Sequence, residues 1–429
     1  MAQKKPADKT SSKPSAAAKE KKTPSKVRKE REHYTFGKVD VFLLLTMVII
    51  IGFGLIMLYS VSSYEAQTLL GDPAWYVKKQ LISCVVGFAA MAVLAVIPYT
   101  FWQKKITVAL YLLSLASVLL VKTSLGYEAH GARRWIRIRS GFTLQPAELV
   151  KIGVILMMAL FITLYQKKMD NLLVYTVAFM ICAAGAGLVA VVTDDLGTSM
   201  VIFAIGFVML IIAEPKKRYL AVTLLLLIGA VVILILSKDF RRTRILAWIH
   251  LEEYADSISY QPIQALYAIG SGGFFGKGIG KSTQKMGFIP ESQNDMIFSI
   301  ICEELGIVGA AVLIILFIVL IWRFVVIYRS TGTFFGKMLV AGVMGHIGSQ
   351  VILNLAVVTS LVPNTGVPLP FISYGGSSVI ILMAEMGLVF SVNRIETRVR
   401  IEKKNREKAQ TEVIRLSPKN ARMKKQIAI

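Results

Sequence analysis

Two carboxylates lie where a long polar stretch gives way to an apolar one. Glu291 and Asp295 belong to the stretch FIPESQNDMIFSIICEELGIVG (288–309), just before an apolar run that starts near residue 296. A partly desolvated carboxylate at such a boundary could act as a general base toward an amphipathic substrate. Asp295 or Asn294 could instead cap the helix that follows, because short polar side chains accept hydrogen bonds from first-turn N–H groups. The spacing leaves both interpretations open.

A second charged pair lies inside an apolar run. Glu148 and Lys151 stand three residues apart in QPAELVK (145–151) and therefore share a helix face. Charges within a bilayer are costly and are functional candidates by default. These two could form an internal ion pair. Alternatively, Lys151 could join Arg134 near the external mouth of the bundle and bind an anionic ligand such as a phosphate group.

Other polar residues also fall in or beside apolar runs. Asp194 and Asp195 open one run, where helix capping and the helix dipole both favour acidic residues. Three more acidic residues lie within runs: Glu303, Glu304 and Glu385. One face of another run carries polar residues at four-residue spacing, namely His346, Gln350 and Asn354. Polar stripes of that kind often hold membrane helices together.

The glycine-rich stretch GSGGFFGKGIGKS (270–282) superficially resembles a phosphate-binding loop. Between Gly276 and Gly280-Lys281-Ser282 there are three intervening residues, whereas the phosphate loop needs four. No strand is predicted before it, and the segment is expected to face outside. Nucleotide binding is therefore excluded, and tight turns with close backbone approach are expected instead.

Composition predicts an integral membrane protein. The 429 residues are 55% hydrophobic and 17% charged, with a mean hydropathy of +0.61, whereas soluble chains carry roughly a quarter charged residues. Of the net charge of +23, residues 1–32 contribute +7 and residues 393–429 contribute +8. These basic tails flank apolar runs, which indicates the cytoplasmic side rather than nucleic-acid binding. The three cysteines lie in apolar runs, so neither disulfides nor a zinc site is expected.

Ten apolar segments are long enough to be transmembrane helices, and they predict an all-α fold. They lie at approximately 40–61, 78–98, 105–121, 147–165, 171–192, 196–213, 218–237, 296–327, 338–361 and 371–392. With the N-terminus inside, every inside loop is positive, as the positive-inside rule requires. The predicted parts are a disordered basic tail (1–38), helices 1–7 (39–237), an extracellular loop (238–295), helices 8–10 (296–393) and a second basic cytoplasmic tail (394–429).

The predicted extracellular loop 238–295 is too long for a simple connection, and such loops are usually functional or disordered. Its first part, FRRTRILAWIHL (240–251), mixes Arg with large apolar residues at helical spacing, as an interfacial helix does. A second helix is predicted from Gln261-Pro262 to Ile269, because Pro favours helix starts and Gly270 follows the end. The loop is therefore expected to be partly helical.

Motifs over residues 40–395 resemble the SEDS family, whose members polymerise peptidoglycan from lipid II. They occur in family order: GARRWI (131–136), QPAEL-K (145–151), DLGT (195–198), YQPIQAL (260–266), GSGG (270–273), FIPESQND (288–295) with EELG (303–306), and LPFISYGGSS (369–378). The PES-QND form and GIGKSTQK are more similar to the FtsW division and SpoVE-like sporulation branches than to RodA. Thr193-Asp194 replaces the QP that many members have before DLGT, a departure that concerns Asp195.

The resemblance implies an inverting peptidoglycan glycosyltransferase with Asp295 as the general base. That base would take the proton of the 4-hydroxyl of the acceptor N-acetylglucosamine, and undecaprenyl pyrophosphate would leave from the donor. The implied substrate-binding residues are Arg134, Glu148, Lys151, Asp195, Gln264, Lys285, Glu291 and Ser377. No metal ligands and no certain cofactor are implied, although a divalent cation (Mg or Mn) could assist departure of the leaving group.

The implied partners are lipid II, a class B penicillin-binding protein transpeptidase and other divisome membrane proteins. The implied location is the bacterial cytoplasmic membrane at the division septum, with both termini cytoplasmic. A lipid II flippase would use the same cavity and cations, and a non-catalytic divisome scaffold is a third possibility. The external loop and the carboxylate at the outer face favour the enzyme, since transporter sites tend to lie at the midplane.

Overall fold

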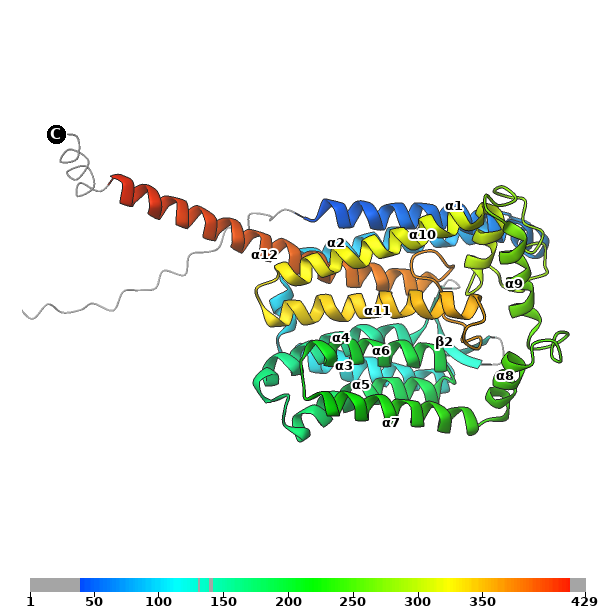
Figure 1. Ribbon diagram of the computed structural model, residues 1–429, viewed down its shortest axis with the longest axis horizontal. Coiled ribbons are helices and arrows are strands. Elements are labelled where there is room, and N and C mark those ends of the chain that lie inside the picture. Colours follow the sequence, from blue (N-terminus) through cyan, green and yellow to red (C-terminus); the bar gives the residue numbers. More distant parts are fainter. Residues whose placement is uncertain (1–38, 130–131, 139–141, 417–429) are drawn as a thin grey trace, which may run out of the picture. The chain divides into compact units, whose positions relative to one another are not determined.

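Apolar helices account for most of the chain in the computed structural model, which describes residues 39–129, 132–138 and 142–416 (Figure 1). They are α1 (Val41–Leu70), α2 (Trp75–Val96), α3 (Lys105–Leu119), α4 (Pro146–Tyr165), α5 (Leu172–Val192), α6 (Leu196–Ile212), α7 (Lys217–Leu236), α8 (Asp239–Ile249), α9 (Tyr260–Gly272), α10 (Ile297–Ser330), α11 (Phe334–Val358) and α12 (Gly376–Leu416). Short 3-10 helices lie at Tyr99–Trp102, Leu120–Lys122 and Gln166–Lys168. The predicted tail 1–38 lies outside the described residues.

The helices match the predicted apolar segments. Within the described ranges, nine are long and apolar enough to cross a bilayer, and α6 is a shorter apolar helix of 17 residues. Helices suit this solvent because they satisfy their own backbone hydrogen bonds. The chain is a mostly helical membrane protein, whereas ten complete crossings remain a prediction. Helix α12 starts at Gly376, later than expected, and continues past the boundary predicted at residue 394.

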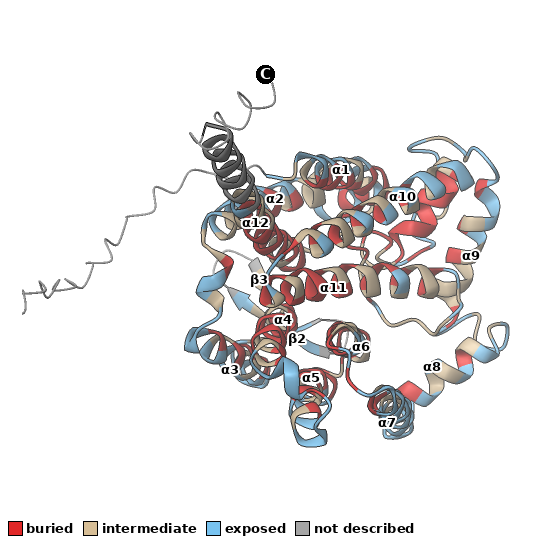
Figure 2. Ribbon diagram, turned by 60° about the vertical axis from the view of Figure 1, so that its left-hand side comes forward, coloured by how far each residue is buried: buried red, intermediate tan, exposed pale blue. Residues whose placement is uncertain are grey.

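Helices α4, α6, α11 and α12 provide much of the buried interior, and α7 is largely exposed (Figure 2). Helix α11 packs on α4, α6, α10 and α12, while α12 also packs closely along α2. Gly387 permits that approach, because a Cβ there would lie 2.6 Å from the Met91 carbonyl oxygen. The side chains that face lipid are apolar, for example Leu225 and Ile233 on α7, each 69% exposed.

A small sheet lies between α3 and α4. Strands β1 (Gly126–Ala129), β2 (Ala132–Ile138) and β3 (Phe142–Leu144) pair antiparallel in the order β1-β2-β3. The sequence ARRWIRI of β2 alternates, so Arg134 points to the opposite face from Arg133 and Trp135. The sheet thereby directs Arg134 toward the bundle.

The predicted external loop contains both expected helices. Helix α8 covers the predicted interfacial segment, and α9 begins near Pro262 and ends at Gly272, slightly beyond the predicted end. In Figure 1 both lie at the end of the bundle opposite the C-terminal extension of α12. At that other end Tyr99 contacts Thr333 and Glu396, each at 2.8 Å. The connections therefore separate into two sets at opposite ends of the helices.

Helix α10 is interrupted at Gly306, and the glycine-rich stretch docks there. Gly306 has φ 67° and ψ −166°, a conformation open essentially to glycine alone. The N–H groups of Ile307 and Val308 donate to the Gly273 and Phe274 carbonyls at 3.1 and 3.2 Å. The glycine-rich stretch 270–282, which resembled a phosphate-binding loop, therefore packs its backbone against the break in α10 through these hydrogen bonds.

Replacing Gly306 with Ala should destabilise the protein by at least about 2 kcal/mol. The added Cβ would lie 2.4 Å from the Gly276 nitrogen and 2.5 Å from the Phe274 oxygen. Gly229→Ala on α7 is the matched control, because no atom lies within 4 Å of its Cβ position, and alanine favours a helix by up to about 1 kcal/mol. Thermal unfolding in detergent gives the melting temperatures of Gly306→Ala and Gly229→Ala. Equal melting temperatures for wild type and Gly306→Ala would contradict the interpretation.

Candidate functional site

Asp295 lies at the end of the bundle that also carries α8 and α9, two residues before the start of α10. The helix is capped by Met296 with no side-chain capping bond, and the Asn294 amide donates to Glu291 at 2.8 Å. The capping alternative for Asp295 and Asn294 is therefore wrong. The backbone of Asp295 is fixed by Asn354 of α11, whose Nδ2 donates to the Asp295 carbonyl at 2.7 Å. The residue as a whole is half-buried.

Burial raises the pKa of Asp295 to about 6, because the charged form loses solvation. Glu291, four residues earlier, raises the pKa further by its negative charge. Arg244 of α8 and a hydrogen bond from Asn364 act in the opposite direction and stabilise the carboxylate. A base with this pKa is ionised near neutral pH and still basic enough to take a proton in a transition state.

Two guanidinium groups accompany Asp295. Arg134 donates to the carbonyls of Thr193 and Asp194 at 3.3 and 3.1 Å, and its Nη1 lies 4.0 Å from Asp195. Desolvation and the charge of Arg134 lower the pKa of Arg244, while Asp295 and Asp195 raise it. The two arginines are therefore close enough to interact electrostatically. They form a cationic site beside the candidate base.

Helix α8 is held in place by a buried ion pair. Arg241 is 5% exposed and donates to Asp194 at 3.0 Å, to Ala190 O at 3.2 Å and to Leu234 O at 2.8 Å. Asp194 has a positive φ of 54° and also contacts Lys238. Because Arg241 is locked to the α5–α6 turn, Arg244, one helical turn later, is brought toward Asp295.

Asp195 caps α6, as one interpretation of the sequence predicted. Its carboxylate accepts from the Thr198 N–H and hydroxyl, both at 2.9 Å, and from Gln145 Nε2 at 3.2 Å. The Gln145 N–H donates in turn to the Ser377 hydroxyl at 3.3 Å. Asp195 and Ser377 thus connect the starts of α4, α6 and α12 next to Arg134.

Glu148 and Lys151 form a fully buried pair beneath this surface. Lys151 Nζ donates to Glu148 at 2.8 Å and to Gln350 Oε1 at 3.4 Å, and both charged side chains are 2% exposed. Gln350 Oε1 also contacts His346 at 2.9 Å, and His346 contacts Glu385 at 2.7 Å. The network joins α4, α11 and α12. In the described residues Lys151 contacts these partners rather than Arg134, and its predicted phosphate role remains a prediction.

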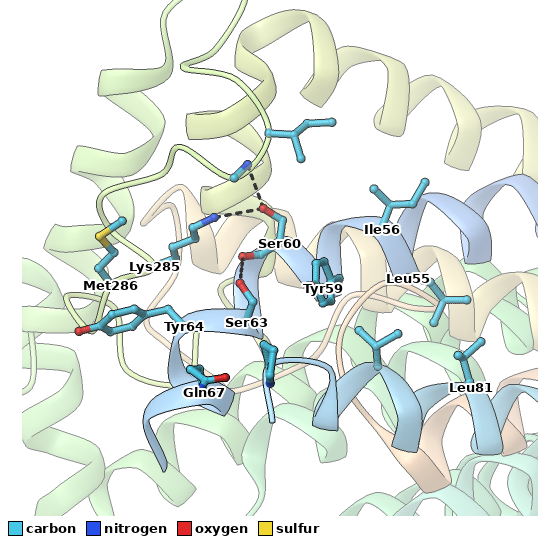
Figure 3. A pocket seen from close by; sticks show the side chains of 14 residues that line it. Leu55, Ile56, Tyr59, Ser60, Ser63, Tyr64, Gln67, Leu81, Lys285 and Met286 are labelled. Carbon is cyan, nitrogen blue, oxygen red and sulfur yellow. Dashed lines mark hydrogen bonds between the residues drawn. The ribbon is translucent and has the colours of Figure 1, made fainter. Parts of the chain in front are cut away.

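Lys285 belongs to a separate cluster. Its Nζ donates to Glu304 at 2.8 Å and to Ser60 at 3.2 Å, while Glu303 accepts from Lys277 at 2.6 Å. Figure 3 shows Lys285 and Ser60 at the polar side of a groove of about 770 Å³ between α1 and α2. The rest of the wall is largely apolar, with Leu55, Ile56 and Leu81 among its lining residues (Figure 3).

The remaining predicted site residues are placed as follows. Glu291 lies beside Asp295 with a positive φ of 51°. Gln264 is half-buried on α9, and it is Gln261, three residues earlier, that bonds to Asn364 at 2.9 Å. Across the described ranges, no group of three His, Cys, Asp or Glu side chains is arranged to hold a metal ion.

Arg244 and Asn364 are site residues that the sequence interpretation missed. A signal for Arg244 was present, because Arg241 and Arg244 are three apart and share a helix face, but it indicated only an interfacial helix. Asn364 lies in the irregular segment between α11 and α12. Its proximity to Asp295 follows from the tertiary fold and has no local sequence pattern.

Residues 41–398 match the FtsW, RodA and SpoVE family of cell cycle proteins. The chain belongs to this family. It is 35% identical over 365 residues to a probable peptidoglycan glycosyltransferase FtsW of Geobacter metallireducens, covering 85% of this chain and 96% of the relative. It is 33% identical over 355 residues to stage V sporulation protein E of Bacillus subtilis, covering 83% and 97%.

A solved structure extends the similarity to the fold. Its description names a peptidoglycan synthase complex and the structural coordination of polymerization and crosslinking by that complex. Its matching chain has a TM-score of 0.68 and 25% sequence identity, and the match covers 83% of this chain and 98% of that one. The family predicted from the motifs is confirmed, and the site described above lies within the matched residues.

The buried pair gives a stability prediction. Lys151→Met leaves Glu148 buried without its cation and should cost about 3–5 kcal/mol. The double variant Glu148→Gln/Lys151→Met should recover much of that loss, because no unpaired charge remains. Lys78→Met is the control, since the Lys78–Asp72 pair is solvent-exposed and should matter little. Denaturant unfolding in detergent measures all three. A double variant as unstable as the single one would show that the pair is not the cause.

Proposed function

We propose that this chain is a peptidoglycan glycosyltransferase that polymerises lipid II into glycan strands at the outer face of the cytoplasmic membrane during septal wall synthesis. The observation that carries the proposal is Asp295, a carboxyl group with a pKa of about 6 beside Arg244 at the outer end of the helices. The names of the relatives support the same activity. Membership of the family does not by itself assign a role to each residue, and the geometry of the site supports the roles proposed for Asp295, Arg134 and Arg244.

The proposed reaction is a single displacement at C1 of the donor sugar. The 4-hydroxyl oxygen of the acceptor N-acetylglucosamine attacks C1, and the bond from C1 to the pyrophosphate oxygen breaks. Asp295 takes the hydroxyl proton, and undecaprenyl pyrophosphate leaves with the bonding electron pair. One displacement inverts the α-linkage to β. A single base fits this outcome, whereas retaining enzymes use a carboxylate pair in which one is the nucleophile.

Arg134 and Arg244 are proposed to bind the pyrophosphate. Their guanidinium groups present planar donor pairs that match phosphate oxygens. Negative charge accumulates on the leaving group as C1–O cleavage proceeds, so cations held in place beforehand stabilise the transition state more than the ground state. Asp195 and the Thr193 carbonyl hold Arg134, and Arg241 fixes the helix that carries Arg244.

The apolar groove between α1 and α2 is proposed to hold a polyprenyl chain. It is about 770 Å³ in volume and is lined mainly by apolar side chains of the two helices (Figure 3). Glu65, which follows the lining residue Tyr64 on α1, accepts a hydrogen bond at 3.1 Å from Gln293, two residues before Asp295. A lipid tail in the groove would therefore place its head group near the base. Lys285 is neutralised by Glu304, so we assign it to shaping the groove.

A class B penicillin-binding protein transpeptidase is the proposed partner. The solved structure similar to this chain comes from a complex described by both polymerization and crosslinking, which supports such a pairing. Contacts with other divisome membrane proteins and location at the septum belong to the same proposal. The basic tails support cytoplasmic termini, since positive charge marks that side.

Asp295→Asn should abolish polymerisation by the purified chain assayed with its cognate transpeptidase. Asn has the same size but cannot take the proton, and loss of a general base costs about 10²–10⁴-fold. Asp239→Asn on α8 is the control, because that carboxylate is 98% exposed. Polymer length and yield from lipid II are read on gels. Equal polymer from Asp295→Asn and wild type would place the base elsewhere. Lipid II transport without polymer from wild type would favour the flippase.

Polymerisation should lose activity as pH falls through about 6, because protonated Asp295 cannot act as the base. Glu291→Gln removes a charge that raises the pKa of Asp295. In this variant the acidic limb of the pH–rate profile, where the rate falls, should therefore move to lower pH. Arg244→Gln should move the limb to higher pH, since the guanidinium lowers that pKa. Initial rates between pH 4.5 and 8, run at about 0.15 M salt, measure the limbs. Shifts in the same direction for both variants would exclude Asp295 as the titrating group.

A further inference from the structure

The glycine-rich stretch 270–282 exposes two aromatic side chains. Phe274 and Phe275 are 63% and 79% exposed, and their rings meet edge to face with the centroids 5.3 Å apart. The backbone around them is irregular, with positive φ values at Gly273, Gly276, Gly278 and Gly280. Large apolar side chains that are exposed together mark a contact with a membrane or with another protein. The height of this stretch along the helices distinguishes the two.

Two helices independently locate the membrane boundary near this stretch. Asp40 caps the start of the apolar helix α1 and forms an ion pair with Arg323 of α10, so this pair marks one boundary of the hydrocarbon. Ser60 follows Asp40 by 20 residues and Glu304 precedes Arg323 by 19, which corresponds to about 30 Å of helix in each case. The hydrocarbon core is also about 30 Å thick. Ser60 donates to Glu304 at 2.6 Å, so both helices place the opposite boundary at this contact.

The exposed aromatic residues are attached to α10 on the membrane side of that boundary. Ile307 lies three residues beyond Glu304 toward the middle of the helix, which is about 4–5 Å deeper. Its N–H donates to the Gly273 carbonyl at 3.1 Å, and the Val308 N–H donates to the Phe274 carbonyl at 3.2 Å. Ile307 is itself 60% exposed and belongs to the apolar surface of α10. The backbone of Phe274 therefore lies at the depth of the outermost part of the acyl chains.

Irregular backbone at this depth needs hydrogen-bond partners within the protein. The break at Gly306 supplies them, because Ile307 and Val308 no longer bond to the carbonyls one turn earlier in α10. Those two carbonyls, of Glu303 and Glu304, accept instead from the stretch, at 2.9 Å each, and the donors are the N–H groups of Lys277 and Gly278. The Gly280 N–H donates to the Ser60 hydroxyl at 3.1 Å. The stretch thus meets the condition for contact with lipid.

The charges of the stretch fit the same depth. Lys277 forms an ion pair with the fully buried Glu303 at 2.6 Å, so this pair adds no net charge at the boundary. Lys281 is exposed and has no ion pair within the described ranges. A long cationic side chain at such a position can extend to the lipid head groups while its stem stays at the apolar edge. Aromatic residues combined with lysine are typical of segments that lie in a membrane interface.

We propose that Phe274 and Phe275 insert into the lipid leaflet at the end of the membrane that carries α8 and α9, with acyl chains as their partner. Residues 273–280 then form a shallow insertion loop. Lipid is the occupant because the loop lies at hydrocarbon depth and continues the exposed apolar surface of α10. Ile279 and Gly280 of the loop also line the groove between α1 and α2, so the loop borders the entrance of lipid to that groove. The inference does not depend on the reaction that the protein catalyses.

Depth-dependent fluorescence quenching tests the insertion loop. The full chain with Phe275→Cys is labelled with nitrobenzoxadiazole and reconstituted into phosphatidylcholine–phosphatidylglycerol vesicles. These contain lipids brominated either near the head group or near the end of the acyl chain. The label is specific, because the native cysteines are buried, namely Cys84, Cys182 and Cys302. Both lipids should quench the label, and bromine near the head group should quench it more strongly, since the loop inserts only a few ångströms.

Two control positions have similar exposure but different surroundings. Ile233 on the apolar helix α7 is 69% exposed, and the side chain of Glu253 in the polar segment between α8 and α9 is 70% exposed. A label on Ile233→Cys should be quenched strongly, and a label on Glu253→Cys should be quenched little. A label on Phe275→Cys that is quenched no more than the one on Glu253→Cys would overturn the proposal.

The same variants distinguish lipid from a protein partner. A saturating amount of the transpeptidase should leave the quenching at Phe275→Cys unchanged, whereas a fall to the level of Glu253→Cys would show that a protein covers the loop and would overturn the proposal. A charged methanethiosulfonate provides a second measurement in unmodified lipid. Phe275→Cys should react about tenfold more slowly than Glu253→Cys, because the reactive thiolate is disfavoured in apolar surroundings. Equal rates for the two thiols would also overturn the proposal.

Discussion

Inside a bilayer a polar side chain must find its partner within the protein, and the polar stripe of α11 meets this constraint in a way that organises the whole site. His346, Gln350 and Asn354 are each fully buried. Through them α11 contacts Glu385 of α12, Lys151 of α4, the Val367 and Pro368 carbonyls, and the backbone of Asp295. Leaving any of these groups unpaired would cost several kcal/mol in hydrocarbon. The position of the segment that carries Asp295 is therefore determined by the same interactions that assemble the core.

At the end of the bundle that carries α8 and α9, some cations are closely paired with carboxylates and others are less closely paired. Arg241 forms an ion pair with Asp194, and Lys285 forms an ion pair with Glu304. In both pairs the cation is buried, and the pairs fix the segment between α7 and α10 to the rest of the bundle. Arg134 lies farther from its carboxylate partner, 4.0 Å from Asp195, and in the proposed reaction Arg134 and Arg244 bind the anionic leaving group. Structural and functional charges thus differ by how completely their partners satisfy them, not by residue type.

Residue patterns predicted the helices, the stripe on α11 and the two helices of the external loop, because each leaves a periodic signal over one continuous segment. They did not predict the sheet at β1–β3, whose short strands are interrupted by charged residues and glycine. Nor did they place Arg244 and Asn364 beside Asp295, since loop closure brings together positions 120 residues apart. The same limit explains Lys151: a three-residue spacing to Glu148 was visible, but its burial against Gln350 depends on how α4 packs on α11.

The proposed base, Asp295, and the leaving pyrophosphate place opposite electrostatic requirements on the site. A base must be desolvated to have a pKa of about 6, yet it must remain ionised at the pH of the reaction. Burial supplies the first condition, and Arg244 with Asn364 supplies the second. The leaving pyrophosphate needs concentrated positive charge, whereas too much of it at the acceptor would lower the pKa of Asp295 and weaken the base. Arg244, which lowers the pKa of Asp295, and Arg134, which is held by Asp195, set the balance between these two demands.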